Sequence, residues 1–365
     1  MKKCLFIATV TEHIVAFHIP YLKWFKEQGW EVHVATNGEE EIPYCDKKHN
    51  IAIQRSPFRP SNLKAYFQLK TILANEKYDI IHGHTPMGGI LARLCGRRHR
   101  KTGTRVMYTA HGFHFYKGAP LINWLLYYPM EKWMSKYTDA LITMNNEDYE
   151  FAKRKMNAKK LYYIPGIGVD TEKFSKPTVD RETKRKELGI PIDATVVISV
   201  GELIKRKNHQ TAIKAISMAN NDKLYYVICG RGELERTLHN ICKELKIKDH
   251  VFLLGYRTDI VDLLHMSDIF LFPSIQEGLP VAMMEAMAAG LPCVVSKIRG
   301  NVDLVEHGKG GYLCEARDVV GYLNAIREIM INTDTKHNRG EINVKSSGKY
   351  NLSVILEKMK EIYEI

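Results

Sequence analysis

Two carboxylates, Glu277 and Glu285, are the residues whose spacing most directly suggests chemistry. Glu277 falls in a predicted turn, and Glu285 lies more than one turn into a predicted helix over 281–289. The two residues therefore do not form a single solvent-exposed charged face of one helix. Carboxylates beside a bound nucleotide commonly accept hydrogen bonds from ribose or sugar hydroxyls. The alternative interpretation is a capping glutamate and an exposed helical glutamate that bind nothing.

The helix start between these carboxylates is expected to hold an anion. An apolar run over 268–273 predicts a buried strand, and Gly278 is expected to let the backbone turn sharply after it. Pro280 is expected to be the first helical residue, and Gly290 supplies the stop signal. The free N–H groups and positive dipole end of such a helix suit a phosphate or pyrophosphate.

A basic loop supplies the matching cations. Arg206 and Lys207 follow the apolar run 195–200 and precede a helix-period segment, 210–218. They are therefore expected at the carboxyl end of a strand, where open parallel sheets bind ligands. Two cations there can neutralise a diphosphate without a metal ion, although a solvated loop is the alternative.

Several separated motifs accompany these residues in a fixed order. Glu277 and Glu285 form an E-x7-E motif, and Lys207 is followed by Asn208. The other motifs are the segments 78–86, 109–115, 164–170 and 229–232. Together they resemble family-four retaining glycosyltransferases of the GT-B fold over essentially the whole chain, with bacterial capsule and exopolysaccharide transferases as the most similar members.

The resemblance implies an α/β protein of two doubly wound Rossmann-like domains facing a cleft. It implies a retaining hexosyl- or N-acetylhexosaminyltransferase that moves a sugar from a nucleotide sugar, expected to be a UDP-sugar, to a lipid-linked glycan in surface polysaccharide biosynthesis. Family members place the first glutamate, here Glu277, on donor-sugar hydroxyls and the second, here Glu285, on the ribose. Lys207, helped by Arg206, then stabilises the departing diphosphate in a front-face displacement.

The remaining site residues follow from the same resemblance. His111 is expected near the donor sugar, and His13, on the first loop, is expected on the acceptor side. His18, His82, His84 and His114 are weaker candidates. The donor- and nucleotide-binding set is Gly201, Gly230, Arg231, Tyr256, Arg257, Gly278, Leu279, Pro280, Val281 and Glu285. No metal ligands and no cofactor are expected, because an Asp-x-Asp motif is absent and Lys207 with a helix N-terminus can hold a diphosphate.

The chain departs from the family pattern at two places. Glu202 stands where many members carry an arginine, which leaves Lys207 as the main diphosphate clamp. The first loop reads Thr9 to His13, where many members have a glycine pair, so the resemblance does not imply a close approach of this backbone to the donor phosphate.

Short apolar runs alternate with helix-period segments, a pattern typical of doubly wound parallel sheets. The expected strands are 5–9, 32–35, 80–81, 106–110, 140–143, 195–200, 225–229, 251–254, 269–272 and 293–296. We expect an acceptor-side domain over 1–172, a charged linker over 173–190, a nucleotide-sugar domain over 191–350, and a terminal helix over 351–365 that packs back on the first domain.

Composition bounds the setting. The 365 residues exceed one ordinary core, and no apolar run is long enough to span a bilayer. Seven scattered cysteines suggest reduced thiols in the cytoplasm.

The formal charge of +12 suits an anionic membrane surface through basic clusters at 97–101 and 153–160, whereas no nucleic-acid-binding signature is present. The aromatic segment 121–133 could rest at that interface or pack in the core. We expect a peripheral protein at the inner face of the cell membrane.

Two other functions remain open. A sugar-nucleotide 2-epimerase of the same fold would release free UDP and sugar without an acceptor, and a non-catalytic basic protein would bind a membrane or nucleic acid without turnover. Nucleotide-sugar turnover that requires a lipid acceptor distinguishes the three functions.

Overall fold

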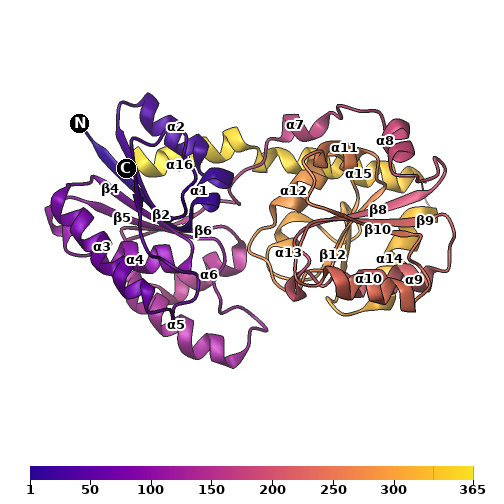
Figure 1. The fold of residues 1–365 in the computed structure, drawn as a ribbon, viewed down its shortest axis with the longest axis horizontal. Helices are drawn as coiled ribbons and strands as arrows, with labels where there is room; N and C mark the ends of the chain where they lie inside the picture. Colours follow the sequence, from indigo (N-terminus) through magenta and orange to yellow (C-terminus); the bar gives the residue numbers. More distant parts are fainter. Residues whose placement is uncertain (332, 365) are drawn as a thin grey trace. The chain divides into compact units, whose positions relative to one another are not determined.

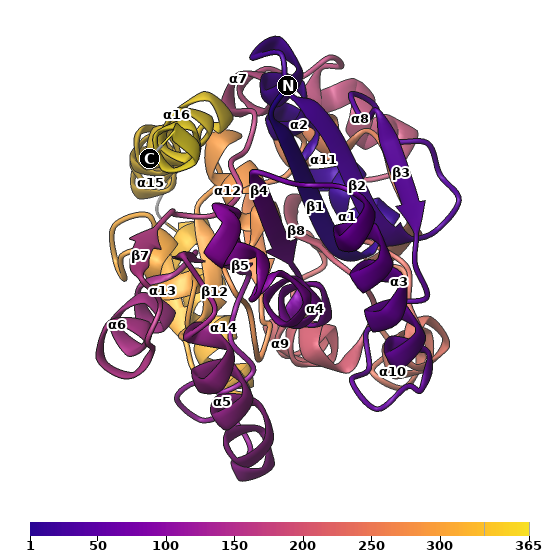
Figure 2. The same ribbon diagram turned by 90° about the vertical axis from the view of Figure 1, so that its left-hand side faces the viewer.

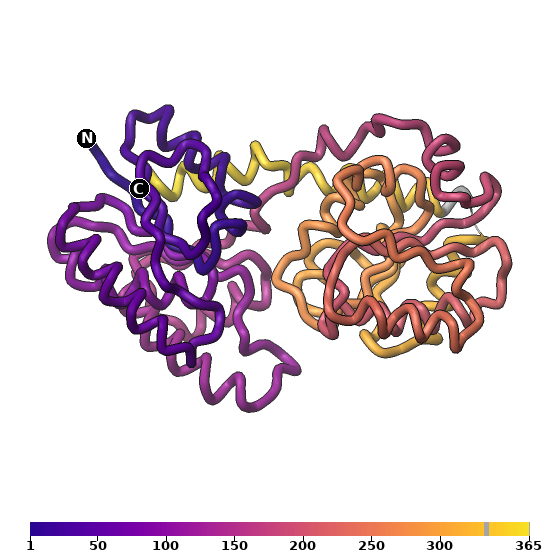
Figure 3. Tube along the Cα trace, viewed as in Figure 1, coloured from indigo at the N-terminus to yellow at the C-terminus, as the bar shows by residue number. Residues whose placement is uncertain are grey.

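The chain folds into two compact units. The computed structural model describes residues 1–331 and 333–364. Unit 1 comprises Met1–Ile167 together with Lys358–Ile365, and unit 2 comprises Gly168–Glu357. Figure 3 follows the chain from indigo through magenta and orange to yellow, and its last residues return to unit 1. Each unit is a parallel sheet covered by helices on both faces (Figure 1).

Unit 1 has a seven-stranded sheet in the order β3-β2-β1-β4-β5-β6-β7. The strands are β1 (Lys3–Val10), β2 (Glu31–Asn37), β3 (Lys47–Asn50), β4 (Ile80–His84), β5 (Arg105–Ala110), β6 (Ala140–Thr143) and β7 (Lys160–Tyr163). Figure 2 shows β4, β1, β2 and β3 side by side. The order reverses between β1 and β4, so the ligand-binding position of a doubly wound sheet lies at the carboxyl ends of these two strands.

Helices cover both faces of this sheet. They are α1 (Thr11–Phe17), α2 (Ile19–Glu27), α3 (Ser61–Asn75), α4 (Pro86–Gly96), α5 (Leu121–Ser135) and α6 (Asn146–Lys155), with a short 3₁₀ turn η1 (His99–Thr102). One core packs Leu5 and Ile7 against α3 and α4. On the other face Phe6 contacts Phe25 of α2 and Tyr363, which is 4% exposed. The alternation of Leu5, Phe6 and Ile7 therefore places one strand in two cores.

Unit 2 has a six-stranded sheet in the order β10-β9-β8-β11-β12-β13. The strands are β8 (Thr195–Val200), β9 (Leu224–Cys229), β10 (Val251–Gly255), β11 (Ile269–Phe272), β12 (Cys293–Ser296) and β13 (Gly311–Cys314). Here the order reverses between β8 and β11, which are hydrogen-bonded neighbours at the centre of the sheet. The carboxyl ends of β8 and β11 are accordingly the expected ligand position.

Two layers of helices enclose the second sheet. The elements are α7 (Thr171–Ser175), α8 (Arg181–Glu187), η2 (Lys205–Lys207), α9 (His209–Ala219), α10 (Glu235–Glu244), α11 (Ile260–His265), α12 (Val281–Ala288), α13 (Asn301–Leu304), α14 (Val319–Ile331), α15 (Thr333–Ser347) and η3 (Gly348–Tyr350). The last helix, α16 (Leu352–Glu364), begins in unit 2 and ends in unit 1. One core lies between the sheet and α11 and α12, and the other lies between the sheet and α9, α10 and α14 (Figure 1).

The structure places the predicted linker, 173–190, inside unit 2. These residues form most of α7 and all of α8, and Arg185 is 1% exposed despite its charge. Its guanidinium donates to Asp268 at 2.8 Å and to the carbonyls of Met266, Ile192 and Ala194 at 3.0, 2.7 and 2.7 Å. A charged run that looked solvated is thus part of the fold, because its cations have buried partners.

Within residues 1–331 and 333–364, the helices are all too short or too polar to cross a bilayer.

Candidate active site

The cations and the first carboxylate of the predicted site meet in unit 2. Arg206 and Lys207 follow β8 in the 3₁₀ turn η2, and Glu277 follows β11. Because β8 and β11 are the adjacent strands at which the sheet order reverses, these side chains lie at the switch point of the sheet. Sequence patterns placed each residue at a strand end, and the topology brings them together.

Glu277 binds both cations through one oxygen atom. Its Oε1 accepts hydrogen bonds from Lys207 Nζ and from Arg206 Nη1, each at 2.8 Å. The exposed fractions of the side chains are 9% for Glu277, 11% for Lys207 and 36% for Arg206. Within the described residues no hydrogen bond to Oε2 is formed, so that oxygen can accept one from a ligand. Glu202, the departure from the family pattern, is exposed and only 3.8 Å from Arg206.

Burial makes Lys207 a poorly solvated cation. Its ammonium lies 4.5 Å from the centre of the Phe272 ring, in a cation–π contact. Burial lowers the pKa of Lys207 below its ordinary value, and the Glu277 carboxylate opposes that shift. A desolvated ammonium interacts more strongly with a phosphate than an exposed one does.

Asn208 and Arg299 hold the turns that carry these groups. Asn208 adopts a left-handed backbone (φ 57°), and its Nδ2 donates to the carbonyls of Pro273 at 3.0 Å and Ala316 at 2.7 Å. Arg299 Nε donates to the Glu277 carbonyl at 3.1 Å. Sequence reasoning named Asn208 only as part of a motif and missed Arg299. Arg299 could have been found in the same way as Lys207, because it also follows the carboxyl end of a strand, β12, and parallel sheets bind ligands at such ends.

The tight turn at the site depends on other glycines than the predicted Gly278. Gly278 does not take a positive φ, whereas Gly300 has φ 82°, and a Cβ there would lie 2.2 Å from the Gly278 carbonyl oxygen. On the β8 side, a Cβ at Gly230 would lie 1.9 Å from the carbonyl oxygen of Gly201. Gly201 and Gly230 were predicted as donor-binding residues, and the structure shows that they let two strand ends approach each other.

The second carboxylate lies on α12. This helix begins at Val281, so Pro280 is its cap and not its first helical residue, while Leu279 and Val281 pack partly buried against the core. Glu285 is half-buried, and burial raises the pKa of its carboxyl to about 7, with Lys173 opposing the shift. Glu285 therefore titrates near neutral pH, unlike an exposed glutamate.

The remaining predicted donor-binding residues differ in availability. Arg231 and Tyr256 are exposed to solvent, and 68% of Tyr256 is accessible. The Arg231 side chain passes next to Gly255, since its Nε would lie 3.8 Å from a Cβ atom added at that glycine. Arg257 instead forms a two-point ion pair with Asp259 at 2.8 and 2.6 Å. That pair raises the pKa of Arg257 further above its ordinary value and occupies the guanidinium, so its contact with a donor is the least supported of the set.

The predicted histidines gather at the switch point of unit 1. His111 directly follows β5, and His84 ends β4. His13 was expected on a loop, but residues 11–17 form α1. Burial lowers the pKa of His13 to about 4, with Arg55 acting in the same direction, and holds the pKa of His111 well below the ordinary value. These imidazoles are neutral at pH 7 and can accept as well as donate hydrogen bonds.

Of the other histidines, His82 is fully satisfied inside the protein. Its Nδ1 contacts the Tyr363 hydroxyl at 2.9 Å and its Nε2 contacts the Thr109 hydroxyl at 2.8 Å. His114 lies on the wall of a pocket of about 510 Å³ that His13 and Arg55 also line. The pocket identifies a surface of unit 1 on which a ligand can rest.

Comparison with known proteins agrees with this geometry. Residues 3–146 match the family Glycosyl transferase 4-like, and residues 180–345 match Glycosyl transferases group 1. The chain is 41% identical over 366 residues to "Putative glycosyltransferase EpsD" of Bacillus subtilis (strain 168), covering 99% of this chain and 96% of that protein. It is 34% identical to an Escherichia coli UDP-Gal:alpha-D-GlcNAc-diphosphoundecaprenol alpha-1,3-galactosyltransferase, covering 83% and 79% of the two chains.

A solved structure agrees as well. Anabaena HepE in complex with UDP and glucose superposes with a TM-score of 0.81 at 18% identity, covering 100% of both chains. The predicted fold is thereby confirmed. The chain belongs to the family-four glycosyltransferases of the GT-B fold.

Proposed function

We propose that this glycosyltransferase moves a sugar, with retention, from a UDP-sugar to a saccharide linked to diphosphoundecaprenol in surface polysaccharide biosynthesis. The observation that carries the proposal is the switch-point cluster of Lys207, Arg206 and Glu277 in unit 2. The substrate classes are those named for the Escherichia coli relative and for the Campylobacter jejuni N,N'-diacetylbacillosaminyl-diphospho-undecaprenol alpha-1,3-N-acetylgalactosaminyltransferase, which is 24% identical over 380 residues.

The cluster supports leaving-group stabilisation without metal chemistry. Lys207 and Arg206 carry the charge that a departing diphosphate needs, and the N-terminus of α12 adds free N–H groups. Glu277 holds both cations through Oε1 and offers Oε2 to a sugar hydroxyl. The acceptor hydroxyl then attacks the anomeric carbon as its bond to the diphosphate breaks, and the diphosphate oxygen takes the acceptor proton.

We place the protein at the cytoplasmic face of the membrane, and α5 supports this part of the proposal. Six apolar side chains spaced as one helix face are exposed there, by 41% to 82%: Leu121, Ile122, Leu125, Leu126, Met130 and Trp133. The opposite face packs through Trp124 and Tyr128 and through the buried Arg93–Glu131 ion pair at 2.7 Å. Residues 121–133 were expected either to rest at a membrane interface or to pack in the core. In α5 one face packs against the core, and the other face is exposed and suits an interface.

The predicted basic clusters contribute unequally. Arg98 and Lys101 are exposed, but Arg100 forms a two-point pair with Asp139 at 2.9 and 2.8 Å and is not available to lipid headgroups. Lys153 and Lys155, at the end of α6, are both exposed. Together with the apolar face of α5, these residues suit an anionic bilayer.

The test is transfer measured with purified protein. UDP-galactose, UDP-glucose and their N-acetylamino forms are each offered with and without a diphosphoundecaprenol-linked N-acetylhexosamine. We expect acceptor-dependent release of UDP with one donor and an α-linked product. Release of UDP and free sugar without the acceptor would instead identify the epimerase, and the absence of any turnover would overturn the proposal.

A further inference from the structure

Unit 1 contains four histidines whose nitrogen atoms converge on one point. His13 lies on α1, His18 joins α1 to α2, His84 ends β4, and His111 follows β5. One nitrogen from each lies within 4.8 Å of the nitrogens from the other three. Separate elements therefore deliver the four rings to the switch point of the sheet.

Four of the eight ring nitrogens in this cluster are buried without a hydrogen-bond partner among the described residues. The atoms concerned are Nδ1 of His18, both ring nitrogens of His84, and Nε2 of His111. His18 and His84 are only 1% and 2% exposed. Each buried polar atom without a partner costs about 1–3 kcal/mol, and native interiors rarely leave several in one place. A shared ligand would satisfy one nitrogen of each ring.

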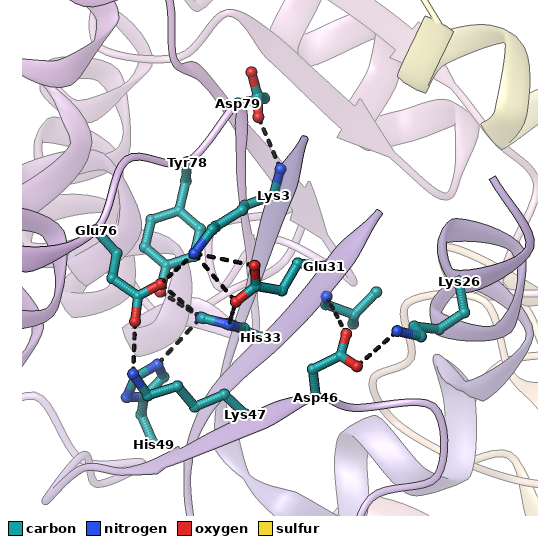
Figure 4. A network of polar contacts seen from close by, with 11 residues as sticks. Lys3, Lys26, Glu31, His33, Asp46, Lys47, His49, Glu76, Tyr78 and Asp79 are labelled. Carbon is teal, nitrogen blue, oxygen red and sulfur yellow. Dashed lines mark hydrogen bonds and ion pairs between the residues drawn. The ribbon is translucent and has the colours of Figure 1, made fainter. Parts of the chain in front are cut away.

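A second cluster in unit 1, formed by His33, His49 and Glu76, differs because its polar atoms are hydrogen-bonded by neighbouring side chains (Figure 4). There His33 contacts the Tyr78 hydroxyl at 2.7 Å and the Glu31 carboxylate at 2.8 Å. Glu76 accepts hydrogen bonds from two lysine ammonium groups, at 2.9 and 2.6 Å. Lysines already supply the positive charge that this carboxylate needs, so a metal ion is less favoured there than at the four histidines.

We propose that His13, His18, His84 and His111 bind a single divalent transition-metal ion, with Zn²⁺ as the expected ion. Imidazole nitrogen is a preferred ligand of Zn²⁺, Cu²⁺ and Ni²⁺, whereas Mg²⁺ and Ca²⁺ require oxygen ligands that this cluster does not offer.

The geometry suits tetrahedral zinc. Zn–N bonds of about 2.0–2.1 Å place ligand nitrogens about 3.3–3.4 Å apart. The Nε2 atoms of His13 and His18 are already 3.3 Å apart. The remaining pairs lie within 4.8 Å, so they need to contract by at most about 1.5 Å to reach this spacing. Arg55 is the cation that acts on His13, and it is exposed, so water screens its repulsion of a bound ion.

Metal binding here would inhibit transfer. A bound ion would fix the His111 ring, which is the residue expected near the donor sugar, and would take its nitrogen lone pair. This consequence rests on the proposed function, whereas the metal binding does not. Zinc would then act on this enzyme as an inhibitor and not as a cofactor.

The test uses the full chain, stripped with EDTA and desalted, and titrated with ZnCl₂ in competition with a chromogenic chelator. We expect one tightly bound ion per chain, and at least a tenfold loss of affinity in both His13→Asn and His111→Asn. These two residues are partly exposed, so their replacement is compatible with folding, which circular dichroism checks. The matched control is His49→Asn, in the second cluster of His33, His49 and Glu76, where His49 Nε2 lies 3.4 Å from His33 Nδ1, and it should leave the affinity unchanged.

Cobalt substitution supplies a second readout. Co²⁺ in a tetrahedral site absorbs visible light far more strongly than octahedral Co²⁺, so the titrated protein should turn blue. Absence of tight zinc binding, unchanged affinity in both variants, or an octahedral spectrum would each overturn the proposal. Stoichiometric binding that leaves transfer uninhibited would uphold the metal site and refute the role of His111.

Discussion

At the scale of single residues, the site rests on Lys207, whose ammonium is buried against an aromatic ring and a carboxylate. We expect Lys207→Ala to lower kcat roughly 10²–10³-fold, because removing one preorganised donor from a developing oxyanion costs about that much. Steady-state transfer at saturating donor measures it. Lys205→Ala, an exposed neighbour in the same turn, is the control. A Lys207→Ala enzyme with near-native kcat would refute the clamp.

The raised pKa of Glu285 predicts that the free energy of unfolding depends on pH. Its pKa rises on folding from 4.5 to about 7, so the folded chain binds this proton more tightly than the unfolded chain. Stability is then lost as the pH rises from about 4.5 to about 7. Glu285→Gln should avoid that loss and raise the free energy of unfolding at pH 8 by up to about 3 kcal/mol, since each pKa unit is about 1.4 kcal/mol.

Urea unfolding of wild type and Glu285→Gln at pH 5 and pH 8 measures this difference, which should be small at pH 5. The same substitution should weaken UDP binding, because it removes the carboxylate assigned to the ribose. An equal stability gain at both pH values would show that the titration of Glu285 is not its cause.

The residue types at the site could be predicted from the sequence, but their contacts could not. Glu277, Lys207 and Arg206 were placed at strand ends by the apolar runs before them. That they share one oxygen atom depends on which strands are neighbours, and strand order is a tertiary property. The ion pair of Arg257 with Asp259 could not be predicted for the same reason, since both residues were visible in the sequence but their geometry was not.

At the scale of elements, the central strands were predicted closely, whereas the edge strands β3, β7 and β13 were missed. The expected strands 195–200, 269–272 and 293–296 coincide with β8, β11 and β12. β3, Lys47–Asn50, has no buried residue and lies at the edge of its sheet, so it carries no apolar signal. α8 was read as a linker because its charged residues find partners that only the fold supplies.

That helix gives an element-scale prediction. Arg185→Ala should lower the free energy of unfolding by about 1–3 kcal/mol, because it leaves three carbonyls without their side-chain donor, while Asp268 keeps its ion pairs with Arg181 and Lys336. Chemical denaturation measures the change. Lys186→Ala, on the exposed side of α8, is the matched control and should change stability by less than about 0.5 kcal/mol.

The exposed face of α5 predicts membrane binding. Leu125→Glu should weaken binding to anionic vesicles about tenfold or more, because burying a leucine side chain contributes about 1.5–3 kcal/mol. Vesicle co-sedimentation measures it, and binding should also fall with added salt. Met218→Glu, at a 51% exposed position on α9, is the control. Equal binding by both variants would exclude α5 as the contact.

At the scale of the whole molecule, both units place their functional side chains where the strand order reverses, after β8 and β11 in one and after β1 and β4 in the other. The cations of unit 2 are built into the chain, so we expect a diphosphate there to need no bridging ion. We expect transfer to persist in EDTA, measured as UDP release with and without added Mg²⁺. Loss of activity in EDTA with recovery in Mg²⁺ would contradict this expectation.

The C-terminal segment of unit 1 bears on how the protein is made. Tyr363 is buried in the core of unit 1, and Arg105 donates to the carbonyls of Tyr363 and Ile362, both at 2.9 Å. Yet the ribosome synthesises all of unit 2 before it reaches this tyrosine. Domains usually fold in the order in which they emerge, but here the earlier one must wait with an incomplete core while the later one is translated. During that interval Phe6 and Phe25 lack the Tyr363 ring that packs against both of them in the folded unit.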